Sequence, residues 1–278
     1  MRERIYESFD IDPGLYGDLI ADAQRATERL RELHPLSQAE QNAIESYEES
    51  FLTRFTYNSA AIEGSTLTLR DTALVLEGEF EPSDDARARD VFAAMGIRDG
   101  CLYADRASNR GRELDENLIR DIHERTALDC QPMTRGAYRI SAVYISGSLT
   151  GAADPLSIRD LMRDLLYAYG NSTEHPIVKT TAFHAMFENI HPFMDGNGRT
   201  GRIIMNRMLM GSGYPPIAIK VATKSKYYEA LEDWQVRGDF APLIERTTEC
   251  IVAEAEARCE AIEATRRAAE ACSTPDPR

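Results

Sequence analysis

Residues 191–202 read His191-Pro192-Phe193-Met194-Asp195-Gly196-Asn197-Gly198-Arg199-Thr200-Gly201-Arg202. An apolar run over residues 203–210 follows, so a buried helix is expected to begin inside this stretch. Glycines ahead of a helix let backbone N–H groups turn toward one point, where they and the helix dipole bind an anion. Arg199 and Arg202 are three residues apart, so on the first helical turn they would project from one side toward that anion. The stretch therefore predicts a phosphate-binding loop at the start of a core helix.

The remaining polar side chains of this stretch favour nucleotide chemistry. The Asp195 carboxylate would repel a phosphate directly, but it can hold Mg²⁺, which also binds phosphate oxygens. His191 is the one group in the stretch that can take a proton near neutral pH. Together these residues predict a magnesium–nucleotide site with a general base beside it.

Two other interpretations of these residues are weaker. His184 and His191 are seven residues apart, so with Asp195 nearby they could share a helical face, as in a metal hydrolase. However, there is no HExxH pair, a proline after His191 ends the helix, and the glycines and arginines would have no role. A Walker A loop needs Lys-Ser/Thr after its second glycine, where Arg199-Thr200 stands.

The composition of the 278-residue chain limits its partners and its setting. The net charge of −14 argues against non-specific nucleic-acid binding and against adhesion to anionic membranes, because both need clustered Lys and Arg. Five cysteines, an odd count without a CxxC pair, favour a reduced compartment. The first residues lack the apolar core of a signal peptide, and no segment approaches the ~18 apolar residues of a membrane span. We therefore expect a cytoplasmic protein.

Helical periodicity and capping residues predict an all-α protein. Ser37 with Glu40 and Thr68 with Asp71 form cap pairs, and Asp154-Pro155 is a cap followed by proline at the first helical position. The strongly apolar helix that leads into residue 191 should be central and buried. The expected helices span residues 15–33, 37–63, 69–77, 84–105, 115–127, 155–170, 176–190, 197–210, 225–237 and 240–270.

The end of the helix at 37–63 carries a second informative stretch, Ser59-Ala60-Ala61-Ile62-Glu63-Gly64. Ser59 and Glu63 share a helical face, and Gly64 ends the helix. A carboxylate near a helix C-terminus is slightly unfavourable, because the helix dipole repels anions there. Glu63 is therefore either a solvated surface charge or the partner of a cation elsewhere in the fold.

Residues 138–147 carry the β signal of this chain. Val143 and Ile145 alternate with the residues between and around them, and glycines bound the segment. A lone hairpin leaves unpaired edge groups. Such a hairpin either packs on the core or pairs with an extended peptide. His123, on the expected helix at 115–127, is interpreted as a surface or internally satisfied histidine.

The stretch at 191–202 resembles the signature of the Fic family, HPFx[D/E]GNGRxxR, at every fixed position. The resemblance implies a Fic-type helical bundle with a short β-hairpin flap. It divides the chain into an N-terminal helical extension (1–56), a Fic domain (57–245) with an inhibitory helix at 57–64, and a C-terminal helix and tail (246–278).

The resemblance also implies an activity, the transfer of AMP from ATP to a Tyr, Thr or Ser hydroxyl of a target protein or of the enzyme itself. His191 would deprotonate that hydroxyl, and pyrophosphate would leave, held by Mg²⁺ on Asp195 and by the arginines. The loop of Gly196, Asn197 and Gly198 would cradle the α- and β-phosphates, with Asn197 adding a side-chain donor. Gly198 favours adenylylation, because the Doc-like branch has Lys at this position and transfers a phosphate instead.

Ser59, Glu63 and Gly64 resemble the family's [S/T]xxxE[G/N] inhibitory motif, in the subgroup that places this helix before the catalytic core. The resemblance pairs Glu63 with Arg202, the arginine that would otherwise grip the γ-phosphate. ATP would then enter in a non-productive pose. In some members the equivalent glutamate also supports removal of AMP, so the resemblance leaves a bifunctional enzyme open.

Two further groups of residues are assigned by the resemblance. The segment at 138–147 resembles the family's GxYR segment and the flap that positions a target side chain. Tyrosines after the motif helix either line the adenine pocket or belong to the core. The flap candidates for target binding are Tyr138, Val143, Tyr144 and Ile145, and the candidates for the adenine pocket are Tyr227 and Tyr228.

Alternative functions remain open at this level. The same fold could transfer another group, such as phosphate, another nucleotide or phosphocholine. A regulatory module that binds ATP without turnover is also possible, although intact His191 and Asp195 argue against it. Fic proteins of this arrangement often self-associate, so a homodimer is plausible.

Overall fold

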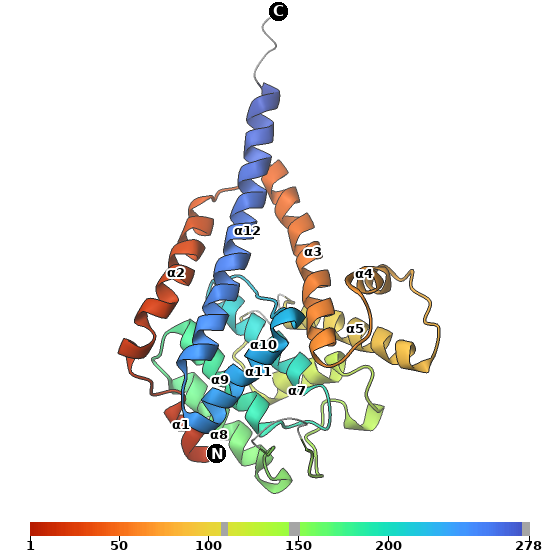
Figure 1. The fold of residues 1–278 in the computed structure, drawn as a ribbon, viewed down its shortest axis with the longest axis vertical. Coiled ribbons are helices and arrows are strands. Elements are labelled where there is room, and N and C mark those ends of the chain that lie inside the picture. Colours follow the sequence, from red (N-terminus) through yellow and green to blue (C-terminus); the bar gives the residue numbers. More distant parts are fainter. Residues whose placement is uncertain (107–110, 145–150, 274–278) are drawn as a thin grey trace, which may run out of the picture.

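The structure, a computed structural model, describes residues 1–106, 111–144 and 151–273, and these residues contain helices and no β-strand (Figure 1). The prediction of an all-α protein is confirmed. Short 3₁₀ turns lie at η1 (Pro13–Leu15), η2 (Pro132–Thr134), η3 (Pro155–Ser157) and η4 (Val221–Thr223), and a π-helical turn, η5 (Asp233–Arg237), follows α11. The α-helices are α1 (Arg2–Glu7), α2 (Gly17–Glu32), α3 (Gln38–Ile62), α4 (Leu69–Glu77), α5 (Asp85–Ala104), α7 (Glu116–Thr126), α8 (Ile158–Asn171), α9 (Pro176–Ile190), α10 (Asn197–Gly211), α11 (Lys224–Glu232) and α12 (Ala241–Ser273).

The two ends of α3 follow from its capping residues. Its first turn has a capping box, in which the Ser37 hydroxyl accepts from the Glu40 N–H and the Glu40 carboxylate accepts from the Ser37 N–H. At the other end, Gly64 has φ 101°, and the Ser65 N–H donates to the Ala60 carbonyl at 3.1 Å. This C-terminal cap needs a left-handed residue after the last helical turn, which glycine adopts without steric cost. It fixes the place at which Glu63 leaves the helix.

Helix α9 forms the centre of the core. It packs against α8, α10 and α12. Phe183 and Phe187 on α9 are fully buried, and Phe193 of the following loop packs against Phe187. Burying each such ring contributes about 1.5–3 kcal/mol. The prediction that this helix is central and buried is confirmed, and its packing anchors the loop that follows it.

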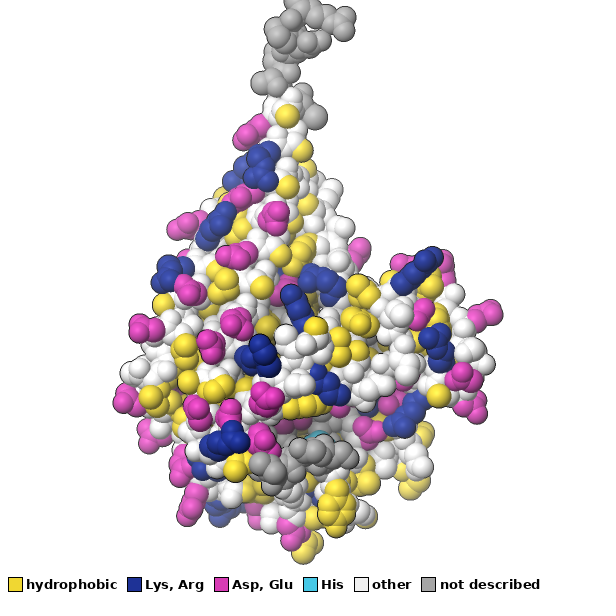
Figure 2. All heavy atoms as spheres, viewed as in Figure 1, with side chains coloured by type: hydrophobic (Ala, Val, Ile, Leu, Met, Phe, Trp, Pro, Cys, Tyr) yellow, Lys and Arg dark blue, Asp and Glu magenta, His cyan; other side chains and the backbone are white. Residues whose placement is uncertain are grey.

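The terminal helices form a layer on one side of this core. Helix α12 extends away from the body, with α2 and α3 packed on either side of it (Figure 1). The domain boundaries predicted at residues 56 and 245 fall inside α3 and α12, both of which run through these positions. Asp and Glu side chains are interspersed with Lys and Arg over the face shown in Figure 2. Within the described ranges, every helix is too short or too polar to cross a membrane.

The predicted β-hairpin is not seen. Residues 138–144 are irregular, and Ile145 with the two residues after it lies outside the described ranges. The Arg139 N–H donates to the Pro192 carbonyl at 2.9 Å, so it is not paired with a strand. Ile140 and Tyr144 are 93% and 95% exposed, so the alternating apolar residues do not bury one face. A short strand is stable only with partner strands or a covering helix, and alternation alone could not supply them.

Candidate functional site

His191 lies at the junction of α9 and the loop, where its backbone is left-handed (φ 52°, ψ 61°). A residue other than glycine keeps this conformation only where its surroundings hold it. Its N–H donates to the Phe187 carbonyl at 2.9 Å, and its carbonyl accepts from Arg139 Nε at 2.8 Å. These contacts fix the direction in which the imidazole leaves the end of α9.

The surroundings of the imidazole suit a general base. Nδ1 of His191 lies 3.4 Å from the Glu188 carbonyl oxygen. Because that oxygen can only accept, the contact places the proton on Nδ1 and leaves Nε2 to accept another. Burial lowers the pKa of His191 below its usual value. The ring is therefore neutral at pH 7 and ready to take a proton.

Asn197 braces the loop that connects His191 to α10. Its Oδ1 accepts from the Phe193 N–H at 2.8 Å, and its Nδ2 donates to the Phe193 carbonyl at 2.9 Å. The side chain is buried. The prediction that it adds a donor to the phosphates is therefore wrong for the amide group as it lies here, because its contacts serve the loop backbone. Asn197 shapes the site by holding Phe193 in the core.

We expect Asn197→Ala to lower the free energy of unfolding by about 2 kcal/mol, because it leaves the N–H and the carbonyl of Phe193 unpaired in the interior. Chemical denaturation measures this change. The matched control is Asn42→Ala on the exposed face of α3, which should change stability by less than about 0.5 kcal/mol. Equal effects of the two substitutions would contradict the bracing role.

Two glycines shape the start of α10, Gly196 through its backbone angle and Gly198 through its lack of a side chain. Gly196 has φ 78° at the N-cap of α10, where it turns the chain into the helix. A Cβ at Gly198 would lie 2.2 Å from Glu63 Oε1 and 2.9 Å from Arg202 Nη1. A side chain at residue 198 would therefore force the ends of the Glu63 and Arg202 side chains to shift. The end of α3 and the start of α10 therefore meet at this residue.

Arg202 is the most enclosed charge of the site. Its Nε donates to the Ser59 hydroxyl at 3.0 Å, and its Nη2 donates to the Ser59 carbonyl at 2.9 Å and to Glu63 Oε1 at 2.8 Å. The Arg202 side chain is 3% exposed, whereas that of Glu63 is 37% exposed. Both members of the Ser59–Glu63 pair thus contact one buried guanidinium, which satisfies the helix-end carboxylate that the sequence singled out.

The charges of this ion pair support each other. Burial disfavours the ionised Glu63 carboxylate, but the Arg202 guanidinium outweighs it and lowers the pKa of Glu63. In the same way, burial disfavours the Arg202 cation, and the Glu63 carboxylate outweighs it and raises the pKa of Arg202. The pair stays ionised at neutral pH. Removing one member of a buried pair leaves the other uncompensated, so both are tightly coupled.

Arg199 faces a different set of partners. Its Nη1 donates to Asp129 Oδ1 at 2.6 Å, and its Nη2 lies 3.4 Å from Asp195 Oδ1. Three residues advance an α-helix by about 300°, so the two arginine side chains diverge by about 60°. The prediction that Arg199 and Arg202 meet one anion is not what this arrangement shows. Arg199 is held by Asp129, and Arg202 is held by Glu63.

Asp195 lies among groups that could exchange with a cation. Its Oδ2 accepts from Arg89 Nη2 at 2.9 Å, and its Oδ1 accepts from the Gly196 N–H at 2.6 Å. Ligand atoms of Asp129, Cys130 and Asp195 lie within 4.8 Å of one another. The two carboxylates fit Mg²⁺, which prefers oxygen ligands. The thiol does not fit, because burial raises the pKa of Cys130 to about 12 and keeps it protonated.

His123 is an internally satisfied histidine, one of the two interpretations that its sequence context allowed. It is buried and stacks on Phe193, with ring centroids 3.7 Å apart. Its Nδ1 accepts from the Gly136 N–H at 2.8 Å, so Nε2 carries the proton and donates to the Asp195 carbonyl at 2.9 Å. Burial lowers its pKa to about 4, which keeps it neutral. The spacing of four from buried Ile119 could have indicated this position.

Arg139 is the arginine of the GxYR-like segment, but sequence reasoning missed its role. Its side chain is buried and donates to the carbonyls of His191, Ser141 and Ala153. It therefore ties the segment at 138–144 to the left-handed turn at His191. No local pattern around residue 139 reveals a contact with a residue 52 positions away.

A pocket of about 580 Å³ opens beside these residues. Both candidate tyrosines line it. Tyr227 is buried, with its hydroxyl 2.7 Å from His184 Nε2, whereas Tyr228 is 42% exposed on the pocket wall. Tyr227 thus serves the core and the pocket together. The other lining residues are Ile62, Glu63, Glu188, His191, Gly198, Arg202, Lys224, Ser225, Glu229, Leu231, Glu232 and Gln235.

The four flap candidates are divided by the structure. Tyr138 is directed inward, with its ring 5.4 Å from that of Phe193, so its prediction as a target-binding residue is wrong in this arrangement. Burial raises the pKa of its hydroxyl. Val143 is half-buried and Tyr144 is exposed, which keeps both available to a partner. Ile145 lies outside the described ranges.

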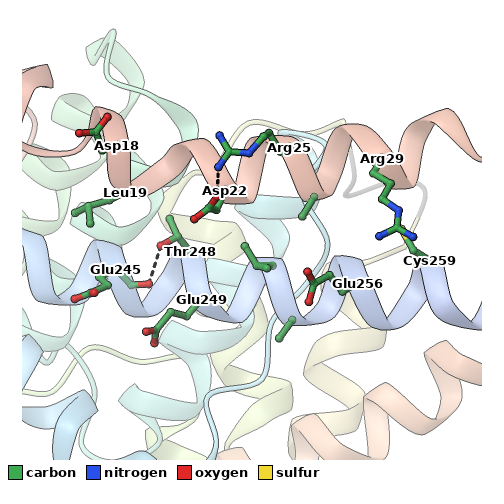
Figure 3. Close-up of a pocket in the computed structure, with 13 residues that line it drawn as sticks. Asp18, Leu19, Asp22, Arg25, Arg29, Glu245, Thr248, Glu249, Glu256 and Cys259 are labelled. Atoms are coloured by element: carbon green, nitrogen blue, oxygen red, sulfur yellow. Dashed lines mark hydrogen bonds and ion pairs between the residues drawn. The ribbon is translucent and has the colours of Figure 1, made fainter.

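A larger open groove, of about 740 Å³, lies between α2 and α12 (Figure 3). Acidic side chains of both helices border it, and the Asp22–Arg25 ion pair lies along α2. It has no histidine and none of the motif residues among its lining. The chemistry that could move a proton or bind a phosphate is gathered in the pocket beside His191.

Comparisons with known proteins agree with this geometry. Residues 113–209 match the model of the Fic/DOC family. The chain is 32% identical over 196 residues to the protein adenylyltransferase Fic of Drosophila willistoni, which covers 70% of this chain and 39% of that protein. The corresponding protein of Drosophila melanogaster is 31% identical over the same length. The chain therefore spans about two fifths of the length of these curated relatives.

Solved structures share the fold. A Fic-domain-containing signalling protein from Bacteroides thetaiotaomicron has a TM-score of 0.76 at 25% identity, covering 88% of this chain and 97% of that one. Fic-1 from C. elegans has a TM-score of 0.77 at 23% identity, covering 91% and 75% of the two chains.

Proposed function

This chain belongs to the Fic/DOC family, and we propose that it is a protein adenylyltransferase, which transfers AMP from ATP to a hydroxyl group of a protein. One observation carries the proposal. A neutral imidazole with a free Nε2 shares a pocket with the buried Arg202 at the N-terminal end of α10. Transfer of a nucleotidyl group needs a base, a cation that binds the phosphates, and N–H donors such as those at the start of a helix.

The reaction assigns one task to each part of the site. Nε2 of His191 takes the proton of the target hydroxyl, and the oxygen forms a bond to the α-phosphorus. The bond from the α-phosphorus to the bridging oxygen breaks, and pyrophosphate leaves with the electron pair. The N–H groups at the start of α10 and the guanidinium of Arg202 balance the negative charge. Mg²⁺ on Asp195 would neutralise the leaving pyrophosphate.

Glu63 is proposed as an inhibitor of this reaction. Its carboxylate occupies the Nη2 face of Arg202, which a γ-phosphate would need. A phosphate must either displace Glu63 or bind in a pose that does not use the arginine. Because the Glu63 side chain is partly exposed and ends a helix, it can leave without disturbing the core. The site therefore has the groups that AMP transfer needs, and Glu63 inhibits their use.

The target is proposed to be a protein with an exposed Tyr, Thr or Ser, or this chain itself. Ile140 and Tyr144 leave an almost fully exposed apolar surface on the segment tied by Arg139 to His191. Such a surface can hold an extended segment of a target beside the imidazole. Tyr138 is not part of it, because its ring packs on Phe193.

Labelled ATP tests the proposal. The Glu63→Gly variant is incubated with Mg²⁺ and with ATP labelled at the α- or the γ-phosphate, and label on protein is measured. We expect only the α label to be retained. Retention of the γ label would indicate phosphate transfer, and retention of neither with ATP still bound would indicate a binding module.

We expect Arg89→Ala to lower the Mg²⁺ concentration at which the Glu63→Gly variant reaches half-maximal self-modification. Arg89 Nη2 contacts Asp195 Oδ2, and a cation on that oxygen must displace it. A severalfold change corresponds to about 1 kcal/mol, the usual limit for an exposed ion pair. A magnesium titration of the initial rate measures it.

The matched control is Arg87→Ala, two residues earlier on α5, whose guanidinium lies 3.7 Å from Asp71 instead. It should leave the magnesium titration unchanged. If Arg89→Ala raises the half-maximal concentration, or if both substitutions act alike, Arg89 does not compete with the cation.

A further inference from the structure

Glu188 is a half-buried acid, with one shielded carboxyl oxygen, that the proposed reaction does not use. It lies on α9, three residues before His191, and lines the same pocket as Arg202 and Tyr227. Its Oε1 is shielded from solvent and has no hydrogen-bond partner among the described residues. A buried polar atom without a partner costs about 1–3 kcal/mol, and such an atom in a folded protein calls for an explanation.

The neighbouring helix makes room for this carboxyl group. A Cβ at Gly201 of α10 would lie 2.4 Å from Glu188 Oε1 and 3.1 Å from the Phe187 ring. Glycine inside a helix costs roughly 0.5–1 kcal/mol relative to alanine. The Glu188 carboxyl group thus occupies a space that Gly201, one residue before Arg202, leaves open, although glycine lowers the stability of α10. The carboxyl group is therefore a built part of the pocket floor.

The charge balance of the pocket explains why the carboxyl group is neutral. Arg202 is already compensated by Glu63, so an ionised Glu188 would place two carboxylates beside one guanidinium. Burial disfavours ionisation most strongly, Glu63 adds to this effect, and Arg202 opposes it. The result is that the pKa of Glu188 rises to about 8. At neutral pH it therefore carries a proton, so a phosphate that binds Arg202 competes with the Glu63 carboxylate and not with Glu188.

We propose that Glu188 is a further nucleotide-site residue, whose protonated carboxyl group keeps Arg202 available to the polyphosphate of a nucleotide. This inference rests on the proposed function. When Glu188 loses its proton, its own carboxylate balances Arg202 and repels the incoming phosphates. Nucleotide affinity thus falls as the pH rises through the ionisation of Glu188.

The histidines and tyrosines near Glu188 have pKa values that are shifted away from the range in which Glu188 ionises. Burial lowers the pKa of His184 to about 3 and also lowers that of His191. Burial raises the pKa of Tyr227 and raises that of Tyr228 to about 12. The charged and titratable groups that line the pocket with Glu188 are Glu63 at the end of α3, His191 at the end of α9, Arg202 on α10, and Lys224, Tyr227, Tyr228, Glu229 and Glu232 on α11.

Calorimetry tests the inference by measuring the dissociation constant of a non-hydrolysable ATP analogue from about pH 7 to about pH 9.5. The measurement is made on the parent, on Glu188→Gln, on Glu63→Gly and on the double variant. In the two proteins that keep Glu188, we expect the dissociation constant to rise up to about tenfold per pH unit above the midpoint. The midpoint should be lower in Glu63→Gly, because the Glu63 anion raises the pKa of Glu188. Glutamine is nearly isosteric and cannot ionise, so the two variants that carry it should give flat profiles.

Adenosine is the matched control ligand, because it lacks the phosphates and should bind without this pH dependence. The inference is overturned if the dissociation constant of the folded parent does not change with pH. It is also overturned if Glu188→Gln leaves the pH dependence of the parent or of Glu63→Gly unchanged, or if adenosine shows the same pH dependence. If the analogue binds none of the four proteins, the proposed function fails instead. A flat parent profile overturns the inference even if a glutamine variant does not fold.

Discussion

The Glu63→Gly variant is expected to modify itself with AMP roughly 5- to 150-fold faster than the parent, the range that a coupling of 1–3 kcal/mol between two sites gives. The substitution frees the Nη2 group of Arg202, which the Glu63 carboxylate holds at 2.8 Å. A γ-phosphate can then take the place of the carboxylate on the buried guanidinium. Incorporation of label from α-labelled ATP, as an initial rate at saturating Mg²⁺, measures the change.

Glu63→Gln tests whether the increase in rate comes from loss of the negative charge or from the backbone flexibility that glycine adds. Glutamine removes the negative charge and keeps the length of the side chain, so we expect an increase smaller than that of Glu63→Gly. Ser59→Ala removes the hydroxyl that accepts from Arg202 Nε but leaves the Ser59 carbonyl in place. It should therefore act least of the three. A Glu63→Gly protein that stays as inactive as the parent would refute the inhibitory assignment.

The parts of the site that could be predicted from sequence are those with local causes. The glycines of the loop, the cap of α3 at Gly64 and the apolar run of α9 are each determined by neighbours a few residues away. The pairing of Glu63 with Arg202 came from the family resemblance, because 139 positions separate the two residues. The structure adds the reason for it, since Gly198 allows the two helix ends to meet.

What could not be predicted depends on contacts between distant segments. Arg89 reaches Asp195 from a helix that precedes it by 106 positions, and no pattern in α5 announces this. Helix geometry places Arg199 and Arg202 about 60° apart on α10, whereas their separate partners, Asp129 and Glu63, depend on how α10 packs. The prediction of a hairpin is wrong for the opposite reason. It rested on local alternation alone, and the described residues supply no strand that could pair with this segment.

Replacing His191 is expected to lower the rate of AMP transfer in the Glu63→Gly background by at least about 100-fold, the lower range for loss of a general base. The substitution removes Nε2, the atom left to accept the proton of the target hydroxyl. Nucleotide binding should persist, because Arg202 and the N-terminus of α10 are untouched. His191→Asn is the better variant, since asparagine adopts the left-handed backbone of this residue more readily than alanine.

The pH dependence of the Glu63→Gly variant gives an independent check on the same atom. A base must be neutral to accept a proton, and burial lowers the pKa of His191. Its neutral form therefore persists to lower pH than that of a free histidine, and activity should be lost only as the pH falls through this lowered pKa. His34→Ala, in the connection between α2 and α3, serves as the control and should keep the rate and the pH profile. If His191→Asn keeps most of the activity while binding ATP, the proton goes elsewhere and the role of the imidazole is wrong.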